Sequence, residues 1–529
     1  MIMGAKRLIL LGMVVLLIVN LSQSEEIPEM SKFNSSVFPD GFIWGTATSA
    51  YQTEGGLDKR GINIWDTFSH NYPGRIDDGS NGDVATDFYK FYKNDTEDMN
   101  KQLGMNGFRF SISWARVIPT GNISEGVSEE GIEFYDRVID EIIKNGMEPF
   151  ATLFHWDVPE ALEVKYGGFR SPKIVSDFED FAALCFKRFN NKVKHWITFN
   201  EPHIFTVFGY DTGSLAPGRC SSWVNKACAA GNSGTEPYKV AHHLLLAHAK
   251  AVQQYRKLNT VGKIGITLDV TFGVPYSGSE ADRNATSRYL DFIFGWFMEP
   301  ITHGHYPRVM RNLVGNRLPI ITDEDSQLLK GSYDFVGLNY YTSNYVSDIL
   351  SPKPVPDHFR YTTDMQVSLT TYNKEGKPIG EQASPSWLYV VPEGIKNLLN
   401  YTKNVYEDPI IYITENGVGD NSTFPPEEAL KDLWRIKYHR SHLWNVFRAI
   451  CEDKVRVKGY FAWSFIDNFE WASGYTVRMG LYATDTNNKL MRTPKLSVGW
   501  FNQFLKDKNS TAGPKCPLRL LQNQDKQEF

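Results

Sequence analysis

Short apolar or aromatic runs alternate with longer stretches of helical periodicity along most of the chain. Eight of these runs have about the length of a buried parallel strand. They cover residues 42–47, 107–111, 149–154, 195–199, 263–268, 335–339, 410–414 and 457–464. Between them lie amphipathic stretches such as residues 130–145 and 176–189. In the first stretch Ile132, Tyr135, Val138, Ile139 and Ile142 recur at helical spacing, which predicts one apolar helix face.

Eight strand-then-helix units predict an α/β protein with a single (β/α)8 barrel and long inserted βα loops. A doubly wound open sheet is the alternative. Polar or flat side chains follow one run after another, and they are Gln52, His155, Trp156, Asn200, Glu201, Asn339, Tyr341, Glu415 and Trp463. In a barrel these strand ends meet on the face that carries active sites, which favours the barrel. Because no low-complexity linker divides the chain, we expect one catalytic domain over residues 25–529.

Two glutamates directly follow buried runs. Glu201 lies in the segment ITFNEP (197–202) and Glu415 in the segment IYITENG (411–417), at the ends of the fourth and seventh predicted strands. Two carboxylates that face each other across a barrel mouth support glycoside hydrolysis, one as a proton donor and the other as an ionised nucleophile or base. A structural ion pair remains the alternative for either residue, and the sequence does not give the separation that distinguishes retention from inversion.

Several further motifs accompany the two glutamate segments in order along the chain. They are AYQTEG (50–55), FSISW (110–114), TLFHW (152–156), GLNYY (337–341) and WSFIDNFEW (463–471). With these motifs the chain resembles the plant β-glucosidases of glycoside hydrolase family 1, from about Phe38 to Leu505. The resemblance implies a retaining mechanism on a (β/α)8 barrel, through a covalent glycosyl-enzyme, with no metal or organic cofactor.

The resemblance also assigns roles to individual residues. It makes Glu201 the acid/base and Glu415 the nucleophile, and it makes Arg109 a buried cation that keeps Glu415 ionised. The positions that match substrate-binding residues are Gln52, His155, Asn200, Asn339, Tyr341, Trp463, Glu470 and Trp471. Asn339 and Tyr341 match residues beside the nucleophile. Trp387 matches a position on the aglycone side. The segment LDKRGINIW (57–65) is shorter than its usual form, and its place near the site entrance suggests an altered aglycone choice.

The leading interpretation is a β-glucosidase that hydrolyses small O-β-glucosides. Enzymes of the same fold that prefer thioglucosides, mannosides or fucosides, or that transfer glucose, remain alternatives. A Glu at position 201 favours O-glycosidic leaving groups without excluding thioglucosides. A catalytically silent carbohydrate-binding protein is the alternative from another class, and the presence of both glutamates disfavours it.

The N-terminus has the pattern of a secretory signal. Lys6 and Arg7 precede an apolar run over residues 8–19, and small polar residues end at Ser24, after which we expect cleavage. Secretion makes glycosylation plausible at seven sequons, which are Asn34, Asn94, Asn122, Asn284, Asn400, Asn421 and Asn509. It also permits a disulfide between Cys220 and Cys228. The compartment is left open among the extracellular space or apoplast, the vacuole and the endoplasmic reticulum body.

The composition limits the classes of partner that the protein is expected to bind. The formal net charge is -5, from 56 basic and 61 acidic residues, which argues against a nucleic acid partner. Past the leader no apolar stretch is long enough to span a bilayer, so we expect no membrane contact in the mature form. The aromatic fraction of 14% fits both a large core and a site lined with flat rings for sugars. The partner that remains is a small-molecule β-glucoside. The oligomeric state is not readable.

Overall fold

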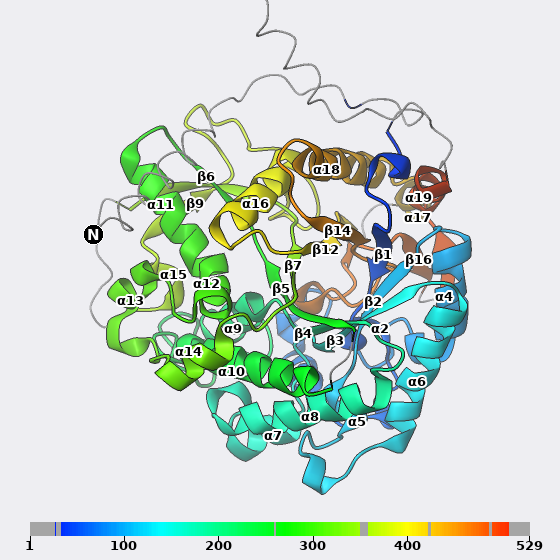
Figure 1. Ribbon diagram of the computed structural model, residues 1–529, viewed down its shortest axis with the longest axis horizontal. Coiled ribbons are helices and arrows are strands. Elements are labelled where there is room, and N and C mark those ends of the chain that lie inside the picture. The colour runs from blue at the N-terminus through cyan, green and yellow to red at the C-terminus, as the bar shows by residue number, and fades with distance from the viewer. Residues whose placement is uncertain are drawn as a thin grey trace, which may run out of the picture.

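Eight parallel strands close into a barrel in a computed structural model that describes residue 27 and residues 33–258, 261–349, 358–421, 425–485 and 489–506 (Figure 1). Around the barrel the order is β1, β2, β3, β4, β5, β7, β12 and β14. Their bounds are β1 Ile43–Ala47, β2 Gly107–Ser111, β3 Glu148–Phe154, β4 His195–Asn200, β5 Lys263–Asp269, β7 Phe335–Asn339, β12 Ile411–Asn416 and β14 Val457–Ala462. The predicted barrel is therefore confirmed and the open sheet is wrong.

Helices cover the outside of the barrel (Figure 1). The main ones are α4 Phe88–Lys101, α6 Glu129–Lys144, α8 Lys173–Phe189, α10 Glu236–Arg256, α12 Trp296–His303, α14 Asp323–Leu329, α16 Pro392–Val405, α18 Leu433–Cys451 and α19 Leu496–Lys506. Helix α6 shows why they form. Ser128 caps its first turn by accepting a hydrogen bond from Gly131 N, and Glu129 and Glu130 complement the helix dipole. Its apolar stripe is buried against the barrel as the periodicity predicts.

Shorter elements lie in the connections between the barrel strands and the main helices. The helices are α2 Ala50–Thr53, α3 Ile64–Asn71, α5 Trp114–Val117, α7 Glu160–Tyr166, α9 Pro202–Tyr210, α11 Glu280–Leu290, α13 Arg308–Val314, α15 Tyr361–Asp364 and α17 Pro426–Leu430. The strands are β6 Phe272–Pro275, β8 Ser343–Asp348, β9 Val367–Thr370, β10 Glu381–Gln382, β11 Tyr389–Val390, β13 Asp420–Asn421, β15 Val477–Arg478, β16 Tyr482–Asp485 and β17 Met491–Pro494. Most follow the C-terminal ends of barrel strands, so the insertions surround one mouth of the barrel.

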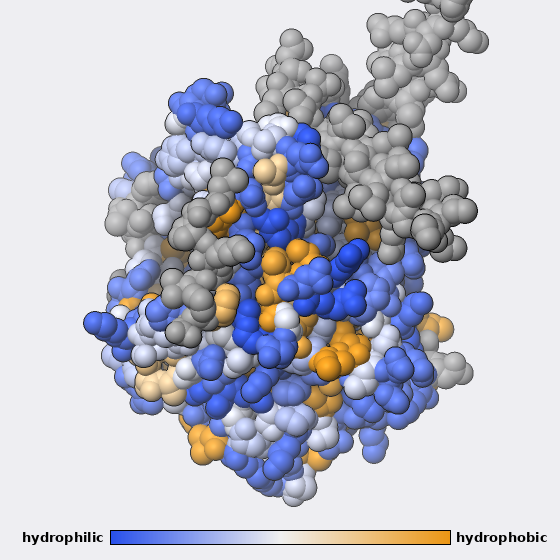
Figure 2. All heavy atoms as spheres, turned by 90° about the vertical axis from the view of Figure 1, so that its left-hand side faces the viewer, coloured by the Kyte–Doolittle hydropathy of each residue, from blue (hydrophilic) through white to orange (hydrophobic). Residues whose placement is uncertain are grey.

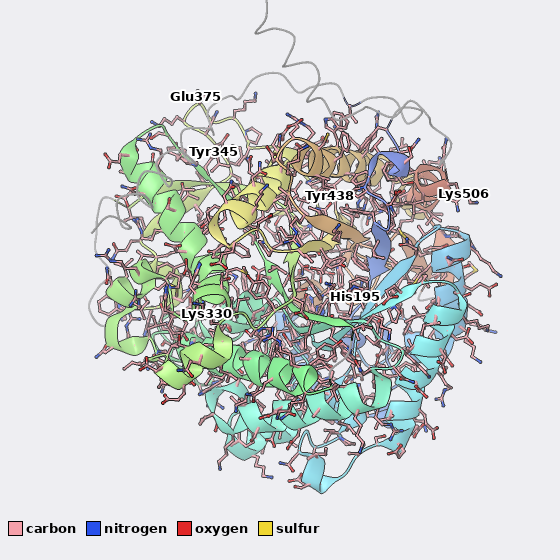
Figure 3. All side chains as sticks on the ribbon, viewed as in Figure 1. His195, Lys330, Tyr345, Glu375, Tyr438 and Lys506 are labelled. Carbon is pink, nitrogen blue, oxygen red and sulfur yellow. A yellow bond between two sulfur atoms is a disulfide. The ribbon has the colours of Figure 1, made fainter. Side chains whose placement is uncertain are left out.

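The barrel interior is filled below that mouth. The filling side chains are Phe150, Ile197, Phe335, Tyr412 and Phe461. His195, at the start of β4, lies among the strands in Figure 3 and stacks on the Phe150 ring at 4.2 Å between centroids. Because this layer leaves the interior packed, polar chemistry is confined to the strand C-termini.

The outer surface is predominantly hydrophilic on the face shown in Figure 2, where apolar side chains are exposed in a few separate groups. Within the described residues, no helix has both the length and the apolar character needed to cross a membrane. The leader predicted over residues 1–24 lies outside the described residues.

Candidate active site

Arg109 connects the ends of three barrel strands. It lies in β2 and is completely buried. Its Nη1 donates to Glu415 Oε1 of β12 at 2.5 Å, and its Nη2 donates to Asn200 Oδ1 of β4 at 2.6 Å. A guanidinium fork can hold two acceptors in fixed positions, so this one cation sets the relative placement of Glu415 and Asn200.

The two glutamates are held by different donors. Tyr341 OH donates to the second carboxylate oxygen of Glu415, Oε2, at 2.7 Å. Asn339 Nδ2 donates to Glu201 Oε1 at 2.7 Å, and Thr414 Oγ1 donates to Asn339 Oδ1 at 2.7 Å. Asn339 therefore lies beside Glu415, as predicted, and its amide also bonds to Glu201. Its strand β7 lies between β5 and β12, which puts Asn339 in register with both Asp269 and Glu415.

These contacts give the two carboxyl groups unequal electrostatics. Burial raises the pKa of Glu415, while Arg109 and the Tyr341 hydroxyl act in the opposite direction. Burial raises the pKa of Glu201 well above its usual range, and the neighbouring charges of Glu415 and Asp269 raise it further. A pair with one carboxyl protonated and one ionised is the arrangement that double displacement requires. Both side chains remain reachable, since Glu201 is 7% and Glu415 is 4% exposed.

The backbone at Glu201 is unusual. This residue precedes α9 with φ 44° and ψ 60°, in the left-handed region that non-glycine residues seldom adopt. Its N–H donates to Thr267 O of β5 at 2.9 Å, and Pro202 starts the helix with its fixed φ. A strained conformation of this kind costs on the order of 1–3 kcal/mol and persists only where its surroundings hold it.

His155 bonds to Asn200 through one ring nitrogen and has the other ring nitrogen free to donate. Asn200 Nδ2 donates to His155 Nε2 at 3.0 Å, so the ring proton is on Nδ1. Burial, helped by Arg109, lowers the pKa of His155 well below its usual value and keeps the ring neutral. Its Nδ1 is buried without a hydrogen-bond partner. Such a donor fits a ligand hydroxyl, because a buried polar group otherwise lacks compensation.

Gln52 and Glu470 lie together near this donor. Gln52 Nε2 donates to Asn468 Oδ1 at 3.0 Å and approaches Glu470 Oε2 at 3.4 Å. Ser49 Oγ donates to Gln52 Oε1 at 2.6 Å, which fixes the orientation of the amide. Burial and the charge of Glu415 raise the pKa of Glu470 to about 8, so this carboxyl is predominantly protonated at neutral pH.

Two tryptophans complete the group. The His155 ring is nearly parallel to those of Trp463 and Trp471, with centroids 5.9 and 5.8 Å away. Trp387, by contrast, is 53% exposed and touches only the edge of this group, through a perpendicular contact with Tyr341 at 6.1 Å. The structure thus brings together the two glutamates, Arg109 and all eight residues expected at the substrate, and it leaves Trp387 at the rim.

Two supporting residues had no role assigned from the sequence. Trp156 Nε1 donates to Asn200 O at 2.9 Å, and its ring lies 4.5 Å from that of Trp471. Tyr438 of α18, which Figure 3 labels, accepts from Asn416 Nδ2 and donates to Tyr341 O. The sequence pattern had singled out Trp156 at the end of the third strand without a role. Tyr438 lies in a helix and gave no such signal.

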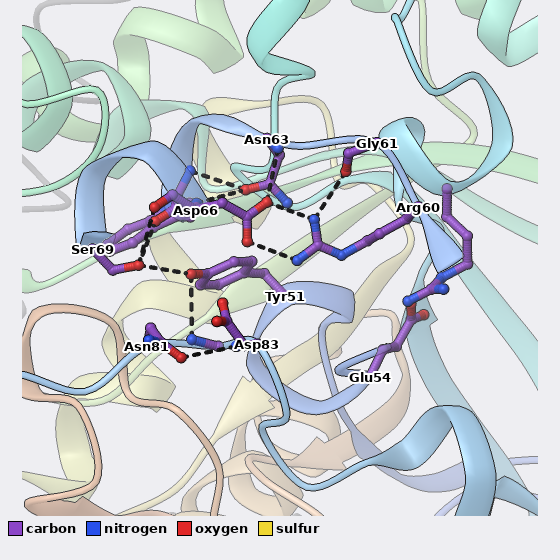
Figure 4. A network of polar contacts seen from close by, with 12 residues as sticks. Tyr51, Glu54, Arg60, Gly61, Asn63, Asp66, Ser69, Asn81 and Asp83 are labelled. Atoms are coloured by element: carbon purple, nitrogen blue, oxygen red, sulfur yellow. Dashed lines mark hydrogen bonds and ion pairs between the residues drawn. The ribbon is translucent and has the colours of Figure 1, made fainter. Parts of the chain in front are cut away.

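The segment over residues 57–65 does more than line an entrance. Arg60 turns inward, its side chain is 3% exposed, and it forms two hydrogen bonds of 2.6 and 2.8 Å with Asp66 (Figure 4). Asn63 and Asp66 form a reciprocal capping box at the start of α3. Tyr51 lies beneath the Arg60 guanidinium, 5.8 Å from ring centre to Cζ. The segment therefore supports the base of α2, which carries Gln52.

The remaining predicted positions fall outside this group. Cys220 and Cys228 form a disulfide, and Cys185 is buried and free. The sequon side chains differ in exposure: Asn94 and Asn284 are exposed, Asn122 and Asn400 are half-buried, and Asn34 is buried. Asn509 and the side chain of Asn421 lie outside what the structure describes. In the described part of the chain, no cluster of three His, Cys, Asp or Glu residues could hold a metal ion.

Comparisons with known proteins identify the family of this chain. The profile of "Glycosyl hydrolase family 1" matches residues 34–510. Beta-glucosidase 12 of Oryza sativa subsp. indica is 53% identical over 475 residues, covering 88% of this chain and 92% of the relative. Raucaffricine-O-beta-D-glucosidase of Rauvolfia serpentina is 48% identical over 517 residues, covering 93% and 95%. A mutant of the rice beta-glucosidase Os3BGlu6, solved in a covalent complex with "Glc from GA4GE", superposes with a TM-score of 0.87 at 45% identity, covering 90% of this chain and 100% of that chain.

Proposed function

The chain belongs to glycosyl hydrolase family 1, and on this premise we propose a division of labour between its two glutamates. The protein is a retaining β-glucosidase, as its relatives and its barrel indicate. In our proposal Glu415 attacks the anomeric carbon of a β-glucoside and forms a glycosyl-enzyme ester. Glu201 protonates the leaving oxygen, and then takes a proton from the water that hydrolyses the ester.

One observation carries this assignment: the donors around the two carboxylates are unequal. Glu415 receives a cation on one oxygen and a hydroxyl on the other, and both stabilise its ionised form. Glu201 is buried, receives a single amide donor and lies near the Glu415 carboxylate, which favours its protonated form. The nucleophile must be ionised and the acid protonated at the start of the reaction, which supports the roles in this order.

The group around His155 supports binding of the glycone. We assign its free Nδ1 donor, the Glu470 carboxyl and the Gln52 amide to the sugar hydroxyls, and the Trp463 and Trp471 rings to the apolar C–H face of the sugar. Asn200 and Asn339 hold these groups in register with the reacting carbon. The exposed Trp387 ring would then contact the aglycone.

The wider setting is part of the same proposal. We assign residues 1–24 to a cleaved secretory leader and residues 25–529 to one catalytic domain, placed in the extracellular space, the vacuole or an endoplasmic reticulum body. Exposure favours Asn94 and Asn284 as glycan acceptors. The Cys220–Cys228 disulfide supports an oxidising compartment.

Turnover of two aryl glucosides separates the roles. Glu415→Gln should lose hydrolysis of both p-nitrophenyl and 2,4-dinitrophenyl β-D-glucoside. In kcat/KM, which reports the first step, Glu201→Gln should lose about 10²–10⁴-fold on the first substrate and much less on the second, because 2,4-dinitrophenolate leaves without a proton. Glu130→Gln, at an exposed carboxylate, is the control. NMR should detect β-glucose as the first product. Equal losses of kcat/KM on both substrates in Glu201→Gln would contradict the acid role.

A further inference from the structure

A chain of polar side chains leads away from Glu201 along α9. His203 lies two residues after Glu201, in the first turn of this helix. Its Nδ1 is 2.8 Å from Asp269 Oδ2, and its Nε2 is 3.0 Å from Tyr361 OH. Tyr361, in α15, donates its hydroxyl proton to Phe292 O at 3.0 Å. The four groups come from segments that are far apart in the sequence.

The positions of the protons follow from counting donors. A tyrosine hydroxyl has one proton, and with that proton on Phe292 O the Tyr361 oxygen accepts from His203 Nε2–H. The other contact joins His203 Nδ1 to a carboxylate oxygen. Two lone pairs facing each other at 2.8 Å would repel, so a proton lies there as well. His203 and Asp269 together therefore hold one proton more than a neutral imidazole and a carboxylate would.

Asp269 is the neighbour that makes this proton relevant to catalysis. It is the last residue of β5, in register with Asn339, whose amide donates to Glu201. The Glu201 N–H bonds to Thr267 of the same strand. The Asp269 charge raises the pKa of Glu201. Its Oδ1 is buried with no hydrogen-bond partner, so among the described side chains His203 alone bonds to this carboxylate.

We propose that His203 is a positioning residue for the acid/base: the proton that it shares with Asp269 cancels the charge that this carboxylate would otherwise place beside Glu201. The proposal rests on the acid/base role of Glu201 proposed above. Glu201 must give up a proton in the first step and take one in the second, so its proton affinity must not be too high. A bare Asp269 carboxylate would favour the protonated form throughout and impair the second step.

Other titratable groups also face Glu201 and Tyr361. Glu201 is also faced by Glu415 of β12, by Arg109 of β2 and, across the mouth, by the Tyr341 hydroxyl. Tyr361 is faced by Tyr289 of α11 and by Asp211, which pairs with Arg360. Because Arg109 is already bonded to Glu415, His203 is the cation placed to offset Asp269.

The test is the basic limb of the pH profile of kcat/KM on p-nitrophenyl β-D-glucoside, which reports the acid in the free enzyme. His203→Gln leaves Asp269 uncompensated, so the limb should move up by about one pH unit. Asp269→Asn removes the negative charge, so the limb should move down by a similar amount. The double variant should return close to the wild-type position. Tyr361→Phe should move the limb in the direction of His203→Gln, by less.

A role in packing alone would lower the rates of His203→Gln and Asp269→Asn without shifting their basic limbs in opposite directions. Shifts in the same direction, or no shift in folded variants, would overturn the proposal. If His203→Gln fails to fold, Asp269→Asn and Tyr361→Phe decide by the direction of their limbs. Failure of the acid/base assignment itself looks different: Glu201→Gln would then retain a wild-type basic limb.

Discussion

The hydroxyl of Tyr341 should set the acid limit of activity. Its proton goes to Glu415 Oε2 at 2.7 Å, and this bond is possible only while the carboxylate can accept it. Tyr341→Phe removes the donor and leaves the ring. A hydrogen bond to a charged group contributes about 1.5–3 kcal/mol. At about 1.4 kcal/mol per pH unit, loss of the lower amount raises the pKa of Glu415 by about one unit.

The sign follows from the proposed role of Glu415 as the nucleophile. The nucleophile must be ionised, and activity is lost as the pH falls through its pKa. A higher pKa therefore moves the acid limb of kcat/KM to higher pH, by about one unit in Tyr341→Phe. Activity on the plateau should also fall about tenfold, since Arg109 then orients the carboxylate alone.

Initial rates on p-nitrophenyl β-D-glucoside between pH 4 and 8, read after alkaline quenching, would measure both effects. Tyr340→Phe is a control: Tyr340 is the adjacent residue, is fully buried where Tyr341 is half-buried, and its hydroxyl bonds to Val391 O, away from both glutamates. It should lower thermal stability and leave the limb in place. If the Tyr341→Phe profile overlaid that of the wild type, the proposed support of the Glu415 charge would be refuted.

Two further predictions concern stability. The pKa of Glu470 is about 8 in the folded protein, above its unfolded value, so ionisation destabilises the fold as pH rises from about 4 to 8. Glu470→Gln removes a penalty on the order of 3 kcal/mol at pH 7, and its melting temperature should exceed that of the wild type by a margin that widens with pH; a constant margin would contradict this. Arg60→Met strands the buried Asp66 charge and should cost about 3–5 kcal/mol, against less than 1 kcal/mol for Lys59→Met, whose partner Glu130 is exposed. Equal shifts in melting temperature would exclude this reasoning.

The barrel was predictable because its strands are buried on both faces. Parallel strands of this kind appear as short continuous apolar runs, and all eight runs coincide with barrel strands to within two residues at either end. The inserted strands β6, β8 and β9 gave no comparable signal. They form a separate three-stranded sheet in which buried and half-buried residues do not alternate strictly, so no strand pattern stands out.

The sequence predicted which residues form the site better than it predicted the hydrogen bonds between them. Motifs placed Glu201, Glu415 and Asn339 at strand ends, and consecutive strands in a barrel put β7 between β5 and β12. The sequence did not show that the Asn339 amide reaches across to Glu201 as well as lying beside Glu415. Arg60 is a similar case: a charged residue in a polar loop reads as solvent-exposed, and only the capping box at Asn63 and Asp66 brings its partner inward.

The pairing of His203 with Asp269 shows why an assigned catalytic residue does not determine its own chemistry. The motif around Glu201 predicts a proton donor, but the charge beside that donor depends on whether Asp269 is neutralised. That depends on His203 being protonated, which depends on Tyr361 having already spent its proton on Phe292 O. Each condition involves a residue from a different βα unit, so these residues come into contact only when the barrel has closed. The proton affinity of Glu201 is therefore a property of the assembled mouth, and it can be changed from a residue that never touches the substrate.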